Sequence, residues 1–102
     1  MAGYVENGVH TDHILTAKKN NLQVTYNGLL YKSGAEKVYA HFGYGTKWTN
    51  IDTVLMTKTN KGFHADIPLL KTGTFNIVFK DNAENWDNNN GTNYTFRLKA
   101  KK

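Results

Sequence analysis

The sequence contains no cysteine among its 102 residues and only one proline. The lack of cysteine excludes disulfides, thiol catalysis, iron–sulfur clusters and cysteine-bound zinc. No apolar run approaches the roughly 20 residues that a membrane-spanning helix needs, so we expect no membrane partner. The residues before Asn20 are polar and resemble no secretory signal. This leaves two locations open, the cytoplasm for a complete protein and the extracellular space for a module excised from a secreted enzyme.

Arginine is also scarce, although the formal net charge is +5. Four basic residues lie at the C-terminus, and without them 9 basic residues face 8 acidic ones. Recognition of phosphates and base edges favours the bidentate guanidinium group, and this chain has one arginine, Arg97. We therefore interpret the excess charge as a solvated basic tail and expect no nucleic-acid partner.

Helical spacing of apolar residues is missing as well, and alternation with period two takes its place. Such alternation is typical of strands with one face in a core. The clearest runs are Leu22–Tyr26, Val38–Phe42, Phe63–Ile67, Phe75–Phe79 and Tyr94–Leu98, with further strands expected at Val54–Thr57 and, more weakly, at Ile14–Ala17.

Turn-forming pairs separate these runs, as in Asn27-Gly28 and Lys61-Gly62. Five to seven short strands separated by such turns predict an all-β fold, a single immunoglobulin-like antiparallel β-sandwich. Pro68 closes one run, where its missing N–H is tolerated. We expect residues 20–102 to form the sandwich and residues 1–19 to be an N-terminal extension that belongs to the same domain.

Parity of the side chains places two polar residues on one outer face. His41 alternates with apolar residues in one expected strand, and Lys80 does so in another. If these strands are neighbours, both side chains share a face. Each strand also leads into a loop with a tryptophan, Trp48 after the first and Trp86 after the second, and the chain has only these two tryptophans.

The second tryptophan lies in an unusual loop, Asp81–Asn93, which contains six asparagines. A pyranose ring has a face of C–H groups, which packs on an aromatic plane, and a rim of hydroxyls. An asparagine amide both donates to and accepts from such hydroxyls. Tryptophans beside an amide-rich loop therefore indicate a sugar-binding surface. Indoles set at an angle would suit a curved α-glucan, and coplanar ones a flat cellulose chain.

Two strings of the sequence resemble a known family. They are HFGYGTKW, with His41 and Trp48, and FKDNAENWDNNNGTNYTF, from Phe79 to Phe96. They resemble carbohydrate-binding module family 25, whose members are starch- and glycogen-binding β-sandwich domains, and the resemblance covers Asn20 to Leu98. It implies non-catalytic binding of an α-1,4-glucan or maltooligosaccharide, with a tethered glucan-processing enzyme as a further partner. The implied carbohydrate-binding residues are His41, Trp48, Trp86, Lys80, Asp81, Asn82, Asn85 and Asn88.

Other functions have weaker support in the sequence. A glycosidase needs two carboxylates about 5–9.5 Å apart across a cleft, and no such pair is evident. His10 and His13 lack a third metal ligand, so we expect no metal site and no cofactor, although calcium at the loop of residues 81–91 stays open. The alternative functions are a single-stranded nucleic-acid binder, with bases stacked on the aromatics, and a protein-interaction domain.

Overall fold

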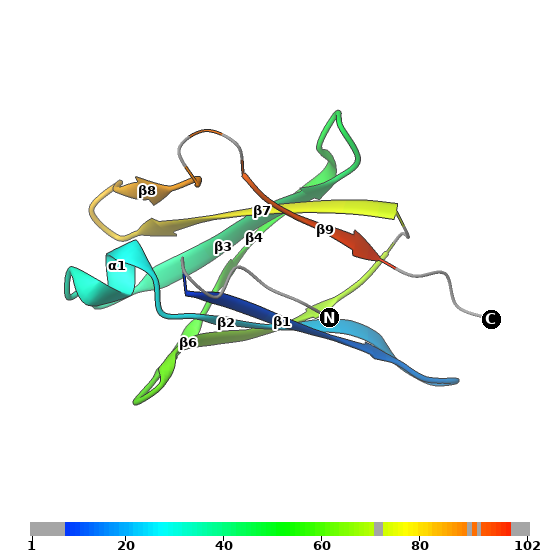
Figure 1. Cartoon of the computed structure of the whole chain (residues 1–102), viewed down its shortest axis with the longest axis horizontal. Coiled ribbons are helices and arrows are strands. Elements are labelled where there is room, and N and C mark those ends of the chain that lie inside the picture. The colour runs from blue at the N-terminus through cyan, green and yellow to red at the C-terminus, as the bar shows by residue number, and fades with distance from the viewer. Residues whose placement is uncertain (1–7, 71–72, 90, 92, 99–102) are drawn as a thin grey trace.

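The computed structural model describes residues 8–70, 73–89, 91 and 93–98 (Figure 1). These residues form nine strands and one short helix. The elements in chain order are β1 (Val9–Leu15), β2 (Asn20–Tyr26), α1 (Leu29–Lys32), β3 (Val38–Tyr44), β4 (Thr49–Leu55), β5 (Thr57–Thr59), β6 (Gly62–Pro68), β7 (Gly73–Asp81), β8 (Trp86–Asp87) and β9 (Tyr94–Leu98).

The strands make two antiparallel sheets that face each other, as Figure 1 shows from the side. One sheet has the order β1-β2-β6-β5. The other has the order β4-β3-β7, and β7 then pairs with β8 near one end and with β9 near the other. The predicted all-β antiparallel sandwich is therefore confirmed.

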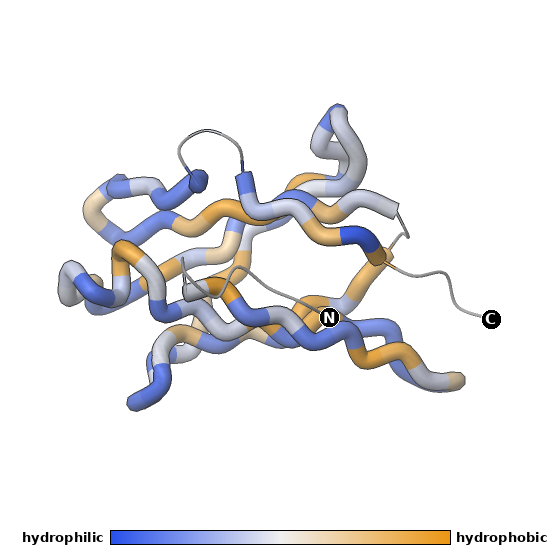
Figure 2. Tube along the Cα trace, viewed as in Figure 1, coloured by the Kyte–Doolittle hydropathy of each residue, from blue (hydrophilic) through white to orange (hydrophobic). Residues whose placement is uncertain are grey.

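The core lies between the sheets and takes alternate side chains from the long strands. Hydrophobic stretches recur along the strands of both sheets (Figure 2). The rings of Tyr26, from β2, and Phe79, from β7, stack with centroids 4.1 Å apart and so join the two sheets directly. The largest fully buried side chains are Tyr26, Tyr94, Phe63, Phe75, Phe79, Leu22 and Ile67.

Two expected strands differ from the observed ones. The strand expected at Ile14–Ala17 is β1, which begins at Val9 and ends at Leu15. It stops there because the Thr16 hydroxyl accepts hydrogen bonds from the N–H groups of Lys18 and Lys19, which closes a tight turn.

The strand expected at Val54–Thr57 is divided between the two sheets. Leu55 ends β4 opposite Tyr39, whereas Thr57 begins β5 opposite His64. Met56 lies between them, buried, and its N–H donates to the Val38 carbonyl. The chain therefore crosses from one sheet to the other at Met56, a change that alternation alone does not reveal.

The helix α1 was not expected, because a single turn is too short to show helical periodicity. Leu30 is buried within it, and its N–H donates to the Tyr26 hydroxyl oxygen at 3.0 Å. Within the described residues, no helix has the length and apolar character to cross a bilayer.

Candidate functional site

The outer face of the sheet β4-β3-β7 carries the residues singled out in the sequence. His41 on β3 lies opposite Thr53 on β4 and Val78 on β7. Directly opposed residues in antiparallel strands point to the same side. Two residues further along β3, Tyr39 lies opposite Lys80, which is on the same face because side chains alternate. The expected neighbourhood of the two strands, and the shared face of His41 and Lys80, are therefore present.

Three rings meet on this face, and we call His41, Trp48 and Trp86 the aromatic cluster. The His41 ring stacks on the Trp48 ring with centroids 6.0 Å apart and an interplanar angle of 25°. Its centroid is 5.9 Å from that of Trp86, and there the planes make an angle of 83°. The two indoles are consequently inclined by at least about 58°, the difference between these angles. The turn before β4 and the short strand β8, which are distant in sequence, thus present an angled pair of aromatic surfaces.

The position of Trp48 depends on a glycine in the neighbouring strand. Trp48 has a positive φ of 54°, which few residues other than glycine adopt. Its indole lies against the backbone of Gly43, where a β-carbon would be 2.9 Å from Trp48 Cε3 and 3.1 Å from Trp48 Cα. Since the Cα atom cannot move away as a flexible side chain does, only glycine leaves room for this indole.

We expect Gly43→Ala to weaken binding of the α-glucan expected from the sequence on the order of tenfold, because the new methyl group displaces Trp48 from His41. The check is a double-mutant cycle of dissociation constants for a maltooligosaccharide. In a Trp48→Ala background, Gly43→Ala should cost no further affinity. Equal losses in both backgrounds would mean that Gly43 does not act through Trp48.

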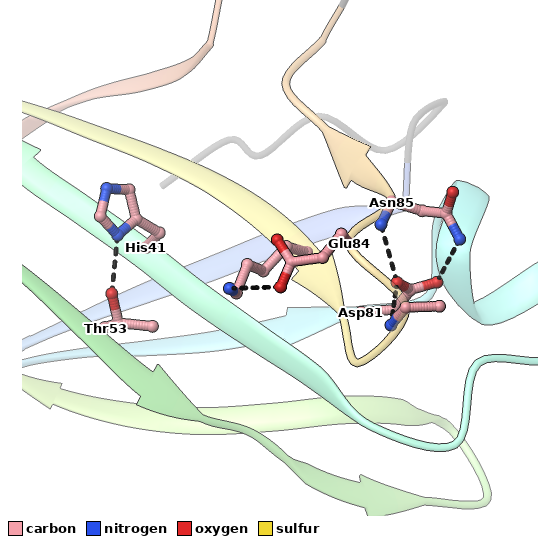
Figure 3. Close-up of polar contacts among 7 residues, drawn as sticks. His41, Thr53, Asp81, Glu84 and Asn85 are labelled. Atoms are coloured by element: carbon pink, nitrogen blue, oxygen red, sulfur yellow. Dashed lines mark hydrogen bonds and ion pairs between the residues drawn. The ribbon is translucent and has the colours of Figure 1, made fainter.

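A threonine orients the His41 ring. His41 Nδ1 and the Thr53 hydroxyl oxygen are 2.7 Å apart (Figure 3). Within the described part of the chain His41 Nε2 makes no hydrogen bond, so it is available to a ligand hydroxyl. The sequence analysis missed Thr53, because almost every position of β4 is exposed and the strand shows no alternation.

Lys80 contacts Trp86 of the aromatic cluster and two residues outside it, Tyr39 and Glu84. Its Nζ atom lies 5.4 Å from the ring centroid of Trp86 and 5.7 Å from that of Tyr39. It also makes an ion pair with Glu84 Oε1 at 3.5 Å (Figure 3). Because the Glu84 carboxylate is exposed, this ion pair contributes little stability, and the contact mainly limits the directions that the ammonium group takes.

Asp81 and Asn85 bond to each other inside the turn between β7 and β8. The Asp81 carboxylate accepts from the Ala83 N–H, the Asn85 N–H and the Asn85 side-chain amide, each at 2.9 Å (Figure 3). The hydrogen bonds from the Asn85 side chain and backbone hold the pKa of Asp81 below its usual value. The buried Asp81 carboxylate therefore shapes the turn that precedes Trp86.

The two remaining predicted residues are exposed. Asn82 lies in the same turn as Asp81. Asn88 follows β8, and its side-chain oxygen accepts from the Gly91 N–H at 3.0 Å. The structure thus brings His41, Trp48, Trp86 and Lys80 together, and Asn82 and Asn88 lie in the segments before and after β8.

Asp87 anchors the loop that carries Trp86. It is buried and accepts hydrogen bonds from the Tyr26 hydroxyl at 2.5 Å and from the Tyr94 hydroxyl at 2.9 Å. The pKa of Tyr26 is raised well above its usual value. Burial is the larger cause, and the hydrogen bond to Asp87 adds to it. The sequence analysis missed this role because a two-residue strand, β8, has no readable alternation.

This arrangement has the chemistry of a recognition surface. Two indoles offer apolar planes, and imidazole, ammonium and amide groups stand at their rim. Among the described residues, no three histidine, aspartate or glutamate side chains come together as potential metal ligands.

Comparisons with known proteins agree with this chemistry. A family model described as starch/carbohydrate-binding module (family 53) matches residues 22–79. An alpha-amylase of Clostridium acetobutylicum is 35% identical over 77 residues, which cover 74% of this chain and 10% of that protein. The chain therefore spans about a tenth of the length of this relative. No solved structure matches. The matched family is numbered 53, whereas the resemblance noted in the sequence was to family 25.

Proposed function

We propose that this chain, which belongs to starch/carbohydrate-binding module family 53, holds its glucan on the aromatic cluster. Membership of this family makes the chain a starch-binding module. Its function is the binding of α-glucan, in agreement with its similarity to an alpha-amylase. The place where the glucan binds is the proposal.

The inclination of the two indoles is the observation that carries this assignment. Planes at least about 58° apart cannot both lie along one flat chain. They can receive successive C–H faces of a chain that curves, as an α-1,4-linked glucan does. Trp86, with 45% of its surface exposed, supplies the more accessible plane. Trp48 and His41 form a stacked second plane.

The polar groups around the cluster divide into two sets. Lys80, Asn82 and Asn88 are the proposed hydroxyl contacts, since the Lys80 ammonium flanks Trp86 and the two amides are exposed. Asp81 and Asn85 are proposed to act indirectly, because their side chains satisfy each other within the turn. We therefore expect substitutions at Asp81 to reduce glucan binding because they change the shape of the turn, without loss of a direct contact to the sugar.

Three narrower statements belong to the same proposal. Kinship with family 25 is supported by the string Trp-Asp-Asn-Asn at residues 86–89 and the rings of His41 and Trp48. The absence of catalysis by this chain is supported by the aromatic character of the face and by the match to a binding-module family. Tethering to a glucan-processing enzyme is supported by the similarity to a short part of an alpha-amylase.

Retention on immobilised starch at two ionic strengths tests the function. Starch carries essentially no charge, so retention should be almost unchanged between about 50 mM and about 200 mM salt, whereas binding through phosphate contacts would fall steeply over that range. Soluble maltooligosaccharide should release the chain, and a cellulose column should not hold it. Strong salt-sensitive binding to a single-stranded oligonucleotide, without retention on starch, would favour the nucleic-acid alternative and refute the proposal.

A further inference from the structure

A row of side chains leads away from the aromatic cluster across four strands. The strand register places Trp86 opposite Lys80, Lys80 opposite Tyr39, and Tyr39 opposite Leu55. All four therefore project from the same outer face. Neighbouring strands lie about 4.8 Å apart, so the row is about 14 Å long. A single pyranose ring is much shorter than this.

The contacts along the row make it continuous. The Lys80 ammonium lies between the rings of Trp86 and Tyr39, 5.4 Å and 5.7 Å from their centroids. An extended lysine presents its methylene stem along the surface and keeps its charge at the end. Only 25% of the Lys80 side chain is exposed, in agreement with such a packed stem.

The far end of the row is an exposed leucine. Leu55 is the last residue of β4, and 57% of its surface is exposed. Tyr39, which lies opposite Leu55 on β3, is half-buried. A lone exposed leucine needs no explanation. Here, however, it continues an aromatic surface whose first part is the proposed glucan site.

We propose that Tyr39 and Leu55 form a second subsite for further glucose units of the same α-glucan chain, beyond those held by the aromatic cluster. This inference rests on the proposed function of that cluster. The C–H face of a glucose unit would pack on the Tyr39 ring and the Leu55 side chain. The Tyr39 hydroxyl offers a donor and an acceptor for the sugar's own hydroxyls. The module would then prefer long glucan chains to short ones.

Titrations of the 102-residue chain with maltotriose and with maltoheptaose test the second subsite. The wild type should bind maltoheptaose about tenfold more tightly than maltotriose. Leu55→Ser and Tyr39→Ala should each remove most of this gain and leave the affinity for maltotriose within about twofold. Leu70→Ser is the matched control, because Leu70 is 69% exposed and lies outside the row, beside a pocket that Phe42 and Pro68 also line. It should keep the full gain.

The outcomes separate the two proposals. If maltotriose binding survives and the gain with length is the same in wild type, Leu55→Ser and Tyr39→Ala, the second subsite is refuted and the cluster stands. If the wild type binds neither oligosaccharide, the proposed function itself fails. Thermal unfolding of each variant shows whether it is folded. Because Leu55 is exposed, Leu55→Ser should disturb the fold less than Tyr39→Ala does.

Discussion

Replacement of Trp86 by alanine should reduce affinity for starch about a hundredfold, which for a weak module means loss of measurable retention. Burial of an aromatic side chain against a ligand is worth about 2–3 kcal/mol, and a tenfold change in affinity corresponds to about 1.4 kcal/mol. Trp86 is 45% exposed and contacts both His41 and Lys80. Its removal therefore takes away a ligand plane and a support for two other proposed contacts.

Two further variants make the Trp86 result specific. Trp86→Tyr keeps an aromatic plane and should retain part of the affinity. Trp48→Ala should also lose binding, because the stacked surface with His41 disappears. All three should unfold close to the wild-type temperature. Unchanged retention of both alanine variants on starch would show that the glucan binds elsewhere.

Replacement of Asp87 by alanine should lower the free energy of unfolding by about 2–4 kcal/mol, because it leaves two buried tyrosine hydroxyls without their acceptor. For a chain of this size, that is a fall in Tm of roughly 10–25 °C. Tyr26 belongs to one sheet and Tyr94 to the other, so Asp87 ties both sheets to the loop of Trp86. Urea unfolding followed by circular dichroism measures the change.

The Asp87→Asn variant distinguishes the role of the acceptor oxygens from that of side-chain volume. An asparagine keeps one acceptor and has nearly the same shape, so its loss of stability should be smaller than that of the alanine variant. At a temperature where Asp87→Asn is folded, its affinity for maltooligosaccharide should still be reduced, because Trp86 is the preceding residue. Two variants as stable as wild type would mean that the tyrosines find other partners.

Long strands made the faces of the sandwich predictable from sequence. In β3, alternation separates the buried Val38, Ala40 and Phe42 from Tyr39 and His41, and the structure has the same division. In β7, alternation with Phe75, Ile77 and Phe79 puts Asn76 and Val78 on the same outer face as Lys80. They are nevertheless buried, and Asn76 bonds with Gly45 and Thr95. Alternation of apolar and polar residues predicts the side of the sheet to which a side chain points. Whether that side chain is buried depends on the neighbouring segments that pack over it.

The finer geometry of the site could not be predicted for three physical reasons. The contact between Trp48 and Gly43 depends on a positive φ in a non-glycine residue, for which tryptophan carries no signal. The inward direction of Asp87 arises in a strand of two residues. The Asp81 carboxylate stays a predicted sugar contact, and its hydrogen bonds to the N–H groups of its own turn could not be read from the sequence. In each case a local backbone conformation decides where the side chain points.

The indole N–H signals of Trp48 and Trp86 give the most direct test of the central claim. The chain has only these two tryptophans, so a ¹⁵N-labelled sample shows two indole resonances, which the Trp48→Ala and Trp86→Ala variants assign. During a titration with maltoheptaose, both should shift and saturate at the same dissociation constant, and cello-oligosaccharides should move neither. If the chain binds maltoheptaose while both indole signals stay in place, the aromatic cluster is not where the glucan binds.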